Sequence, residues 1–265
     1  MPHSSDLLTA ATHVFPNVLL FDGGRYVVAT LVMMVLLAIT HRFGWRARKL
    51  QARDATRSDM VREITASVRS VFIYAAIASP AVWMRWNGYA VGSYTGVPSW
   101  GEVALYVVAL LILHDTWFYW THRWMHQPAQ FKLAHALHHD SRPPTAWAAM
   151  AFHPIEALTG AVVIPLLVFV VPIHISGLGV VLTIMTVMGV TNHMGWEIFP
   201  RFMWEGRLGG WLITASHHQR HHELYACNYG LYFRHWDRVC RTDRGIGDFT
   251  RDHARAALRA QPQQS

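Results

Sequence analysis

Residues 157–191 are 35 consecutive residues without Lys, Arg, Asp or Glu, within the longest uncharged stretch of the sequence. A helix needs about 20 apolar residues to cross a membrane, so this stretch is too long for a single span. Pro172 and the segment 174–177, which contains His174 and Gly177, lie in its middle and predict a tight turn. The stretch therefore predicts two apolar helices that must be buried in a bilayer or in a protein core.

Three shorter apolar runs precede this stretch, at residues 26–40, 71–83 and 103–113. Pro80 lies inside the second run, where a membrane helix tolerates proline better than a soluble one does. Charged residues make up only 15% of the chain, against about 25% in a typical soluble protein. We predict an all-α integral membrane bundle with about 4–5 spanning helices. The alternative is that the same runs are buried helices of a soluble α-helical protein.

Basic residues are distributed unevenly between the predicted loops. Residues 42–62 carry seven Lys and Arg, and ten arginines follow Asn192, whereas residues 1–22 and the loop 87–101 carry none. The positive-inside rule then places the first two regions in the cytosol, with five crossings in all. Residues 1–22 are expected to be irregular and interfacial, without the basic segment of a signal peptide. The net charge of +7 lies beside apolar runs, which favours an anionic membrane surface and no nucleic-acid partner.

Histidine is concentrated in three short boxes. HRWMH contains His122 and His126, HALHH contains His135, His138 and His139, and SHHQRHH contains His218, His221 and His222. Residues three and four apart lie on one face of a helix, so each box can present its imidazoles together. Eight imidazoles exceed the ligand set of one tetrahedral zinc. The boxes therefore predict a shared centre of two metals, since isolated core histidines or a His-rich tail would not recur between long apolar segments.

The boxes alone leave the metal and the reaction open. They contain no cysteine, which excludes a Cys-rich structural zinc site, but imidazole suits iron and zinc alike. A membrane zinc hydrolase would need a HExxH-type box, and HRWMH has Arg123 at the position of the glutamate. A metal transporter would place ionisable residues within its spans, and residues 157–191 contain only His174. These two functions are the alternatives to a metal-dependent oxidoreductase.

Six motifs together resemble the fatty acid hydroxylase/sterol desaturase family of membrane proteins. They are HDTWFYWTHRWMH at 114–126, HALHH at 135–139, FHPIE at 152–156, NHMGWE at 192–197, and SHHQRHH at 216–222 followed by CNYGLYFRHWDR at 227–238. The resemblance covers roughly residues 100–240 and looks closest to the C-5 sterol desaturase branch. The first 70 residues show no match.

The resemblance implies a centre of two iron ions, for which zinc can substitute in purified protein. It assigns as ligands the eight box histidines and a ninth, from NHMGWE: His122, His126, His135, His138, His139, His193, His218, His221 and His222. Possible further ligands, or residues that orient them, are His114, Asp115, His153, His217 and Glu197. Asp115 lies seven residues before His122 and is expected to orient an imidazole. Glu156 and Asp140 are other candidates for that role.

The resemblance also implies an activity and partners. We expect hydroxylation or desaturation of a lipid C–H bond with O2 and with electrons from a separate donor such as cytochrome b5, a ferredoxin or a reductase. The expected divisions are membrane helices and a basic cytosolic loop at 1–100, a catalytic domain at 101–245, and a polar tail at 246–265. The boxes are expected on the cytosolic side of a multi-pass membrane protein. The lipid, and the choice between hydroxylation and desaturation, stay open.

Overall fold

The computed structural model describes residues 10–43, 49–89, 96–171, 174–204 and 210–246. Every element of two or more residues in these ranges is a helix, and the β pairing among them is confined to two isolated bridges, Lys49 with Trp196 and Leu212 with Phe233. The predicted all-α class is confirmed. Most of the predicted tail, from residue 247 onward, lies outside the described residues.

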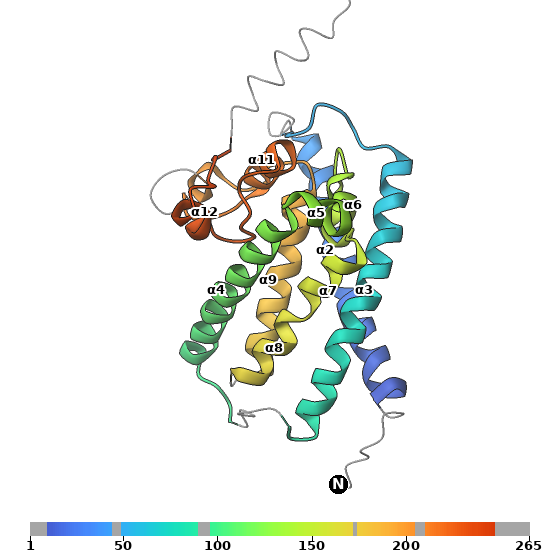
Figure 1. Ribbon diagram of the computed structural model, residues 1–265, viewed down its shortest axis with the longest axis vertical. Coiled ribbons are helices and arrows are strands. Elements are labelled where there is room, and N and C mark those ends of the chain that lie inside the picture. The colour runs from blue at the N-terminus through green and yellow to red at the C-terminus, as the bar shows by residue number, and fades with distance from the viewer. Residues whose placement is uncertain (1–9, 44–48, 90–95, 172–173, 205–209, 247–265) are drawn as a thin grey trace, which may run out of the picture.

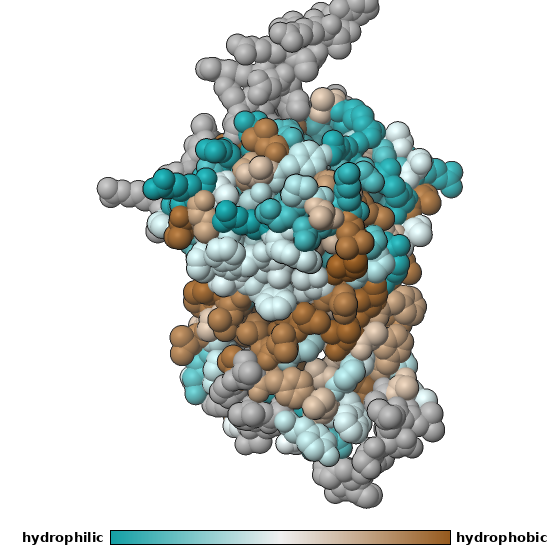
Figure 2. Space-filling view, viewed as in Figure 1, coloured by the Kyte–Doolittle hydropathy of each residue, from teal (hydrophilic) through white to brown (hydrophobic). Residues whose placement is uncertain are grey.

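Four of the helices are long and apolar enough to cross a membrane. They are α2 (Phe15–Arg42), α3 (Arg57–Trp86), α4 (Trp100–Met125) and α9 (Ile175–His193), and they stand side by side as a bundle (Figure 1). Many of their large apolar side chains are exposed, among them Leu31, Val35, Leu105 and Val108. Figure 2 shows the resulting apolar belt below a hydrophilic end. A surface of this kind is that of a membrane bundle rather than of a soluble protein.

The N-terminal segment differs from the prediction. Residues 1–22 were expected to be irregular, but the described part forms a π-helical turn, η1 (Ala10–Val14), and the first turns of α2. Residues 14–21 are largely apolar and prolong the run that begins at Tyr26. The intervening Asp22 and Arg25 form an ion pair one turn apart, so that their charges offset each other within the helix.

The uncharged stretch 157–191 forms three helices rather than two. Its first half divides into α7 (Pro154–Ala161) and α8 (Val163–Val170), and α9 forms the second half. Pro165 explains the break, because it has no N–H to donate to the carbonyl of Ala161 four residues earlier. In Figure 1 α7 and α8 lead away from the histidine-rich end and α9 returns to it. A fifth crossing made by these two short helices stays a prediction.

Capping boxes fix where two of the long helices begin. The Thr56 and Ser99 side chains accept the N3 backbone amides of α3 and α4, and Asp59 and Glu102 accept the cap amides in return. Helix α3 packs against α2, α7 and α8, while α9 packs against α2, α4 and the short helix α11 (Ala215–Leu224). The central position of α9 carries its last residue, His193, into the middle of the histidine-rich end.

Short elements cover that end of the bundle. They are α5 (Pro128–Gln130), η3 (Phe131–His135), α6 (Ala136–His139), the 3-10 helix η4 (Ala146–Met150), α11 and α12 (His235–Val239). The basic segment 49–62 joins them, since Leu50 N donates to Gly195 O and Arg62 Nη2 to Asp140 O. The end of α3 and the start of α4 lie at the opposite end (Figure 1). This arrangement agrees with the charge-based topology, in which the basic regions and the boxes share one side.

Candidate metal centre

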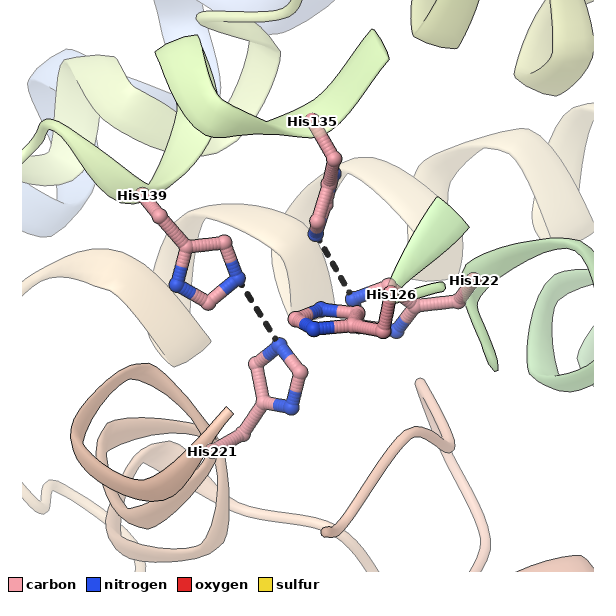
Figure 3. A group of neighbouring side chains, drawn as sticks. All are labelled: His122, His126, His135, His139 and His221. Atoms are coloured by element: carbon pink, nitrogen blue, oxygen red, sulfur yellow. Dashed lines mark hydrogen bonds between the residues drawn. The ribbon is translucent and has the colours of Figure 1, made fainter. Parts of the chain in front are cut away.

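The nine histidines predicted as ligands lie together in two adjacent groups. The first contains His122, His126, His135, His139 and His221, whose rings converge from α4, η3, α6 and α11 (Figure 3). The second contains His138, His193, His218 and His222. In each group, one ring nitrogen per residue lies within 4.8 Å of the others. Each group could therefore hold one metal ion.

Helical spacing determines which histidine belongs to which group. Pairs four residues apart share a group: His122 with His126, His135 with His139, and His218 with His222. The residue three positions after the first, His138 or His221, belongs to the other group. A step of three residues turns about 60° short of a full circle and a step of four about 40° beyond it, so the two directions diverge. The boxes HALHH and SHHQRHH thus each contribute to both groups and hold them next to each other.

The Nε2 atoms are the ones that converge. His122 Nε2 lies 3.1 Å from His135 Nε2, and His221 Nε2 lies 3.1 Å from His139 Nε2. In the second group His193 Nε2 lies 3.1 Å from His138 Nε2 and 2.9 Å from His218 Nε2. His222 Nε2 is 3.1 Å from His218 Nε2.

Backbone carbonyls fix the tautomer of three of these rings. His122 Nδ1 lies 2.8 Å from Tyr229 O, His221 Nδ1 2.7 Å from Cys227 O, and His193 Nδ1 2.7 Å from Gly189 O. A carbonyl only accepts, so each Nδ1 carries the proton and donates. The Nε2 of each neutral ring is therefore a bare lone pair that faces another imidazole, as in a metal ligand oriented from behind.

Glu156 occupies the equivalent position behind His135. Its Oε1 lies 2.8 Å from His135 Nδ1, and both side chains are buried. A carboxylate at this place favours a proton on Nδ1 and a lone pair on Nε2. Glu156 was a candidate for this orienting role from the sequence; the distance permits the role, which stays a prediction because the contact does not meet hydrogen-bond geometry.

This arrangement fits a pair of metal ions. Lone pairs 2.9–3.1 Å apart repel one another unless a cation lies between them. Two imidazole nitrogens bound at about 2.1 Å and at right angles would be roughly 3 Å apart, which matches these distances. The burial of eight of the nine rings, with only His126 half-buried, points the same way.

Burial also keeps the imidazoles neutral, as metal ligation requires. Desolvation lowers the pKa of His138, His218, His221 and His222 well below the ordinary value, and the neighbouring imidazoles lower it further. The same causes lower the pKa of His139. These groups therefore accept a metal ion at neutral pH without first losing a proton.

The motif CNYGLYFRHWDR folds back over the first group and supplies two of the orienting carbonyls. Asp237 accepts the backbone amides of Tyr229 and Gly230 at 2.9 Å, which holds the turn that presents Tyr229 O to His122. A side chain on Gly230 would overlap the Phe233 carbonyl, so the turn requires glycine. Asn228 Nδ2 donates to His217 O and ties the same segment to α11.

The five further candidates lie outside both groups. His114 Nδ1 is 3.1 Å from Tyr232 Oη, and His153 caps α7 by accepting from Ile155 N. His217 is within 3.2 Å of Thr214 N, and burial lowers its pKa to about 3. Glu197 accepts the hydroxyl and amide of Ser216 and the hydroxyl of Thr214, so it secures the first turn of α11.

Asp115 has a different role from the expected one. Its Oδ1 accepts the amides of Leu231 and Tyr232 at 3.0 and 2.8 Å, and its Oδ2 lies 3.7 Å from His235 Nδ1. It thus anchors the C-terminal motif to α4 rather than orienting an imidazole of a box. The spacing argument considered only the helix on which Asp115 lies, and the partner comes from a segment more than a hundred residues away.

A cavity of about 120 Å³ lies on the membrane side of the two groups. Histidines of both groups face it: His122 and His135 from the first, and His138, His193 and His218 from the second. Its other walls include Phe118, Met125, Phe152 and Met185. A bound molecule would therefore meet the candidate metal positions through an apolar chamber within the bundle.

The sequence alone did not identify several residues of this chamber. Asp22, Arg25 and Tyr74 also line it, although they precede every recognised motif. Arg25 and Asp22 could have been noticed as two charges one turn apart beside a long apolar run. The sequence also gave no sign of the orienting carbonyls of Cys227, Tyr229 and Gly189, because every residue has a backbone carbonyl.

The fold and the site together define a helical membrane protein with a histidine-rich candidate metal-binding centre. The model of the fatty acid hydroxylase family matches residues 107–242, just over half of the chain, and the chain belongs to this metal-dependent family. It is 25% identical over 207 residues to "Delta(7)-sterol 5(6)-desaturase ERG3B" of Gibberella zeae, covering 77% of this chain and 62% of that protein. It is 30% identical over 154 residues to "C-4 methylsterol oxidase erg25" of Schizosaccharomyces pombe, covering 54% and 48%.

A third relative is "Lathosterol oxidase" of Mus musculus, 28% identical over 191 residues that cover 69% of this chain and 60% of the relative. The chain thus spans about half to three fifths of the length of these proteins. No solved structure gives a significant match. By their names these relatives are sterol desaturases and sterol oxidases, and the match supports the sterol desaturase branch of the family.

Proposed function

We propose that the nine histidines bind two iron ions, and that the protein uses O2 and external electrons to hydroxylate or desaturate a lipid. One observation carries the proposal: two buried groups of imidazoles lie side by side at the inner end of an apolar chamber. When bound, two iron ions supply the activation of dioxygen that an unactivated C–H bond requires. The relatives act on sterols by name, so a sterol or a related terpenoid is the first substrate class to test.

The chain itself supplies binding, orientation and the exclusion of water. The carbonyls of Tyr229, Cys227 and Gly189 and the carboxylate of Glu156 hold the rings with Nε2 towards the centre. Apolar side chains such as Phe118, Met125 and Phe152 form the chamber walls beside the histidines and would position a C–H bond there. Whether the product gains a hydroxyl or a double bond depends on how the lipid is positioned there.

Electrons must reach the centre from outside the chain. The sequence contains no dinucleotide or flavin fingerprint, so we propose a separate donor such as cytochrome b5, a ferredoxin or a reductase. Arg220 on α11 is half-buried and Arg238 on α12 is exposed, and both belong to helices at the histidine-rich end, so they are candidates to receive an acidic donor surface. We further propose that this end faces the cytosol, as the positive-inside rule predicts.

Lipid profiling tests the proposed reaction. Cells that express the protein should contain a lipid that has gained one oxygen atom or lost two hydrogen atoms. Cells that express a His221→Ala variant at the same level should lack it. Identical lipid profiles in the two strains would contradict the proposal.

A further inference from the structure

A second, larger cavity adjoins the chamber at the candidate metal centre. It measures about 490 Å³, against about 120 Å³ for the chamber. Five residues line both spaces and form a waist between them: Asp22, Arg25, Tyr74, Gly160 and Met185. Beyond the waist the walls are largely apolar, with Asn17 and Arg85 as the polar exceptions.

The order of the spaces along the bundle is the same on three helices. On α9, Leu178 and Leu182 line the larger cavity, Met185 lines both, and Gly189 and His193 line the chamber. On α2 and α3 the shared residues Arg25 and Tyr74 likewise lie between residues of the two spaces. Eight residues separate Met185 from His193, a helical rise of roughly 12 Å. Along α9, the waist therefore lies roughly 12 Å from His193, one of the candidate metal ligands.

The waist is polar although it is surrounded by apolar helices. Arg25 Nη2 donates to Asp22 Oδ1 at 3.0 Å, and the two side chains are only 19% and 16% exposed. Arg25 Nε and Nη1 are buried and have no hydrogen-bond partner among the described residues. Buried donors of this kind are costly unless a ligand or water completes them.

Tyr74 adds a hydroxyl to the same waist. A Cβ on Gly160 would overlap Tyr74 Oη, so the glycine of α7 leaves the room that this hydroxyl occupies. The waist thus combines a guanidinium, a carboxylate and a phenol at the boundary that the two cavities share.

The charges favour an uncharged ligand. Asp22 offsets the charge of Arg25, so a carboxylate or phosphate would meet the nearby Asp22 and add an uncompensated charge to an apolar site. A hydroxyl both donates and accepts, so it can accept from Arg25 Nη1 and donate to the Asp22 carboxylate. The smaller chamber has room for only part of a lipid, so the remainder would occupy the larger cavity.

We propose that Arg25, held by Asp22, binds the hydroxyl oxygen of an uncharged lipid whose apolar body fills the larger cavity. The part of the lipid next to the hydroxyl then extends into the chamber towards the metal centre. This inference rests on the proposed function in that it specifies the substrate of the same site. The waist belongs to α2, α3, α7 and α9, and Asp22, Arg25 and Tyr74 lie outside the segment that matches the family.

Equilibrium binding to the purified full-length protein tests the proposal without metal turnover. The probes are two radiolabelled pairs, cholestanol with cholestane and octadecanol with octadecane, together with octadecanoic acid. The wild-type protein should bind at least one alcohol about tenfold or more tightly than its hydrocarbon, the equivalent of one charge-assisted hydrogen bond. Arg25→Met should abolish that ratio while hydrocarbon binding persists. Arg62→Met, which removes an arginine from the surface of α3, should preserve it.

A second variant guards against a folding defect in Arg25→Met. Asp22→Asn keeps the guanidinium but removes the opposing charge, so octadecanoic acid should bind more tightly relative to octadecanol than it does to the wild type. The proposal is overturned if the wild type prefers neither alcohol, if Arg25→Met keeps the preference, or if the wild type binds the acid more tightly than the alcohol. Binding requires neither iron nor O2, so a failure of the proposed reaction would leave these ratios unchanged.

Discussion

His122 Nε2 and His135 Nε2 lie 3.1 Å apart, with their other ring nitrogens 2.8 Å from Tyr229 O and Glu156 Oε1 respectively. The two outer oxygens direct two lone pairs at each other in a buried space. Without a cation this contact is repulsive, so the positions of the outer oxygens make sense when a metal ion joins the rings. In the second group, Gly189 O likewise fixes the ring of His193 from its Nδ1 side. Both groups therefore contain rings that an outer oxygen orients with Nε2 towards the centre.

Replacing Glu156 tests the role of this outer layer. Glu156→Gln keeps the size of the side chain but removes the charge that favours a proton on His135 Nδ1. We expect metal affinity or turnover to fall about 10–100-fold. Metal titration and turnover assays on the purified protein measure the change. Glu223→Gln, at a partly exposed ion pair with Arg220, is the matched control and should behave like the wild type.

Gly189 provides a probe of the chamber itself. It lines the chamber, and a Cβ there would be 3.9 Å from Ala149 Cβ, so a small side chain fits but a large one must fill the space. Gly189→Phe should keep its iron and lose turnover at least about tenfold, since the lipid can no longer take its position. Gly179→Phe is the control on the same helix, because a Cβ at Gly179 meets nothing within 4 Å. Unchanged turnover in Gly189→Phe would remove this residue from the route of the lipid, and loss of iron would mean that it supports the centre.

The metal-free protein should lose stability in acid. Burial lowers the folded-state pKa of His138, His218, His221 and His222, whereas in the unfolded chain each titrates near about 6.5. The unfolded state therefore binds more protons as the pH falls through about 6.5, and stability present above that value is lost below it. Each such group contributes about 1.4 kcal/mol per pH unit in that range. Thermal unfolding should move to clearly lower temperature between pH about 7.5 and about 5.5, and equal midpoints would refute the assignment of neutral buried imidazoles.

The sequence pointed to the eight box histidines because helical spacing is a local property, whereas His193 came only from the family resemblance. A pattern of i, i+3 and i+4 places imidazoles on one side wherever the helix goes. Spacing also separates the i+3 from the i+4 imidazoles within a box, but which boxes share a group depends on how four separate segments meet, and a one-dimensional pattern does not contain that information. The same limit explains Asp115, whose partners at Leu231 and Tyr232 come from the far end of the chain.

The membrane helices were predictable to a similar extent. Uncharged runs identified all four long helices, because apolar length is visible in the sequence. The start of α2 was missed because Asp22 and Arg25 interrupt the run, although their mutual ion pair lets the helix continue. The break between α7 and α8 depends on Pro165, and the earlier expectation placed the turn only near Pro172.

The side of the membrane on which the centre lies is open to a direct test. Reporter fusions after Arg62 and after Ser265 should give the same cytosolic signal, and a fusion at Ser93 the opposite one. The backbone hydrogen bond from Leu50 N to Gly195 O requires the segment after α2 and the segment after α9 to share one end of the bundle. Opposite signals at Arg62 and Ser265 would contradict the five-crossing topology.

Iron content per chain tests the central claim most directly. Protein purified after growth in iron-rich medium should contain about two iron ions, one for each histidine group. His122→Ala, in the first group, and His138→Ala, in the second, should each lower the metal content and abolish turnover. His174→Asn should keep both, because His174 caps the far end of α9 and Asn can replace it as a cap. A His138→Ala protein with full iron and full turnover would show that the two groups do not form one centre.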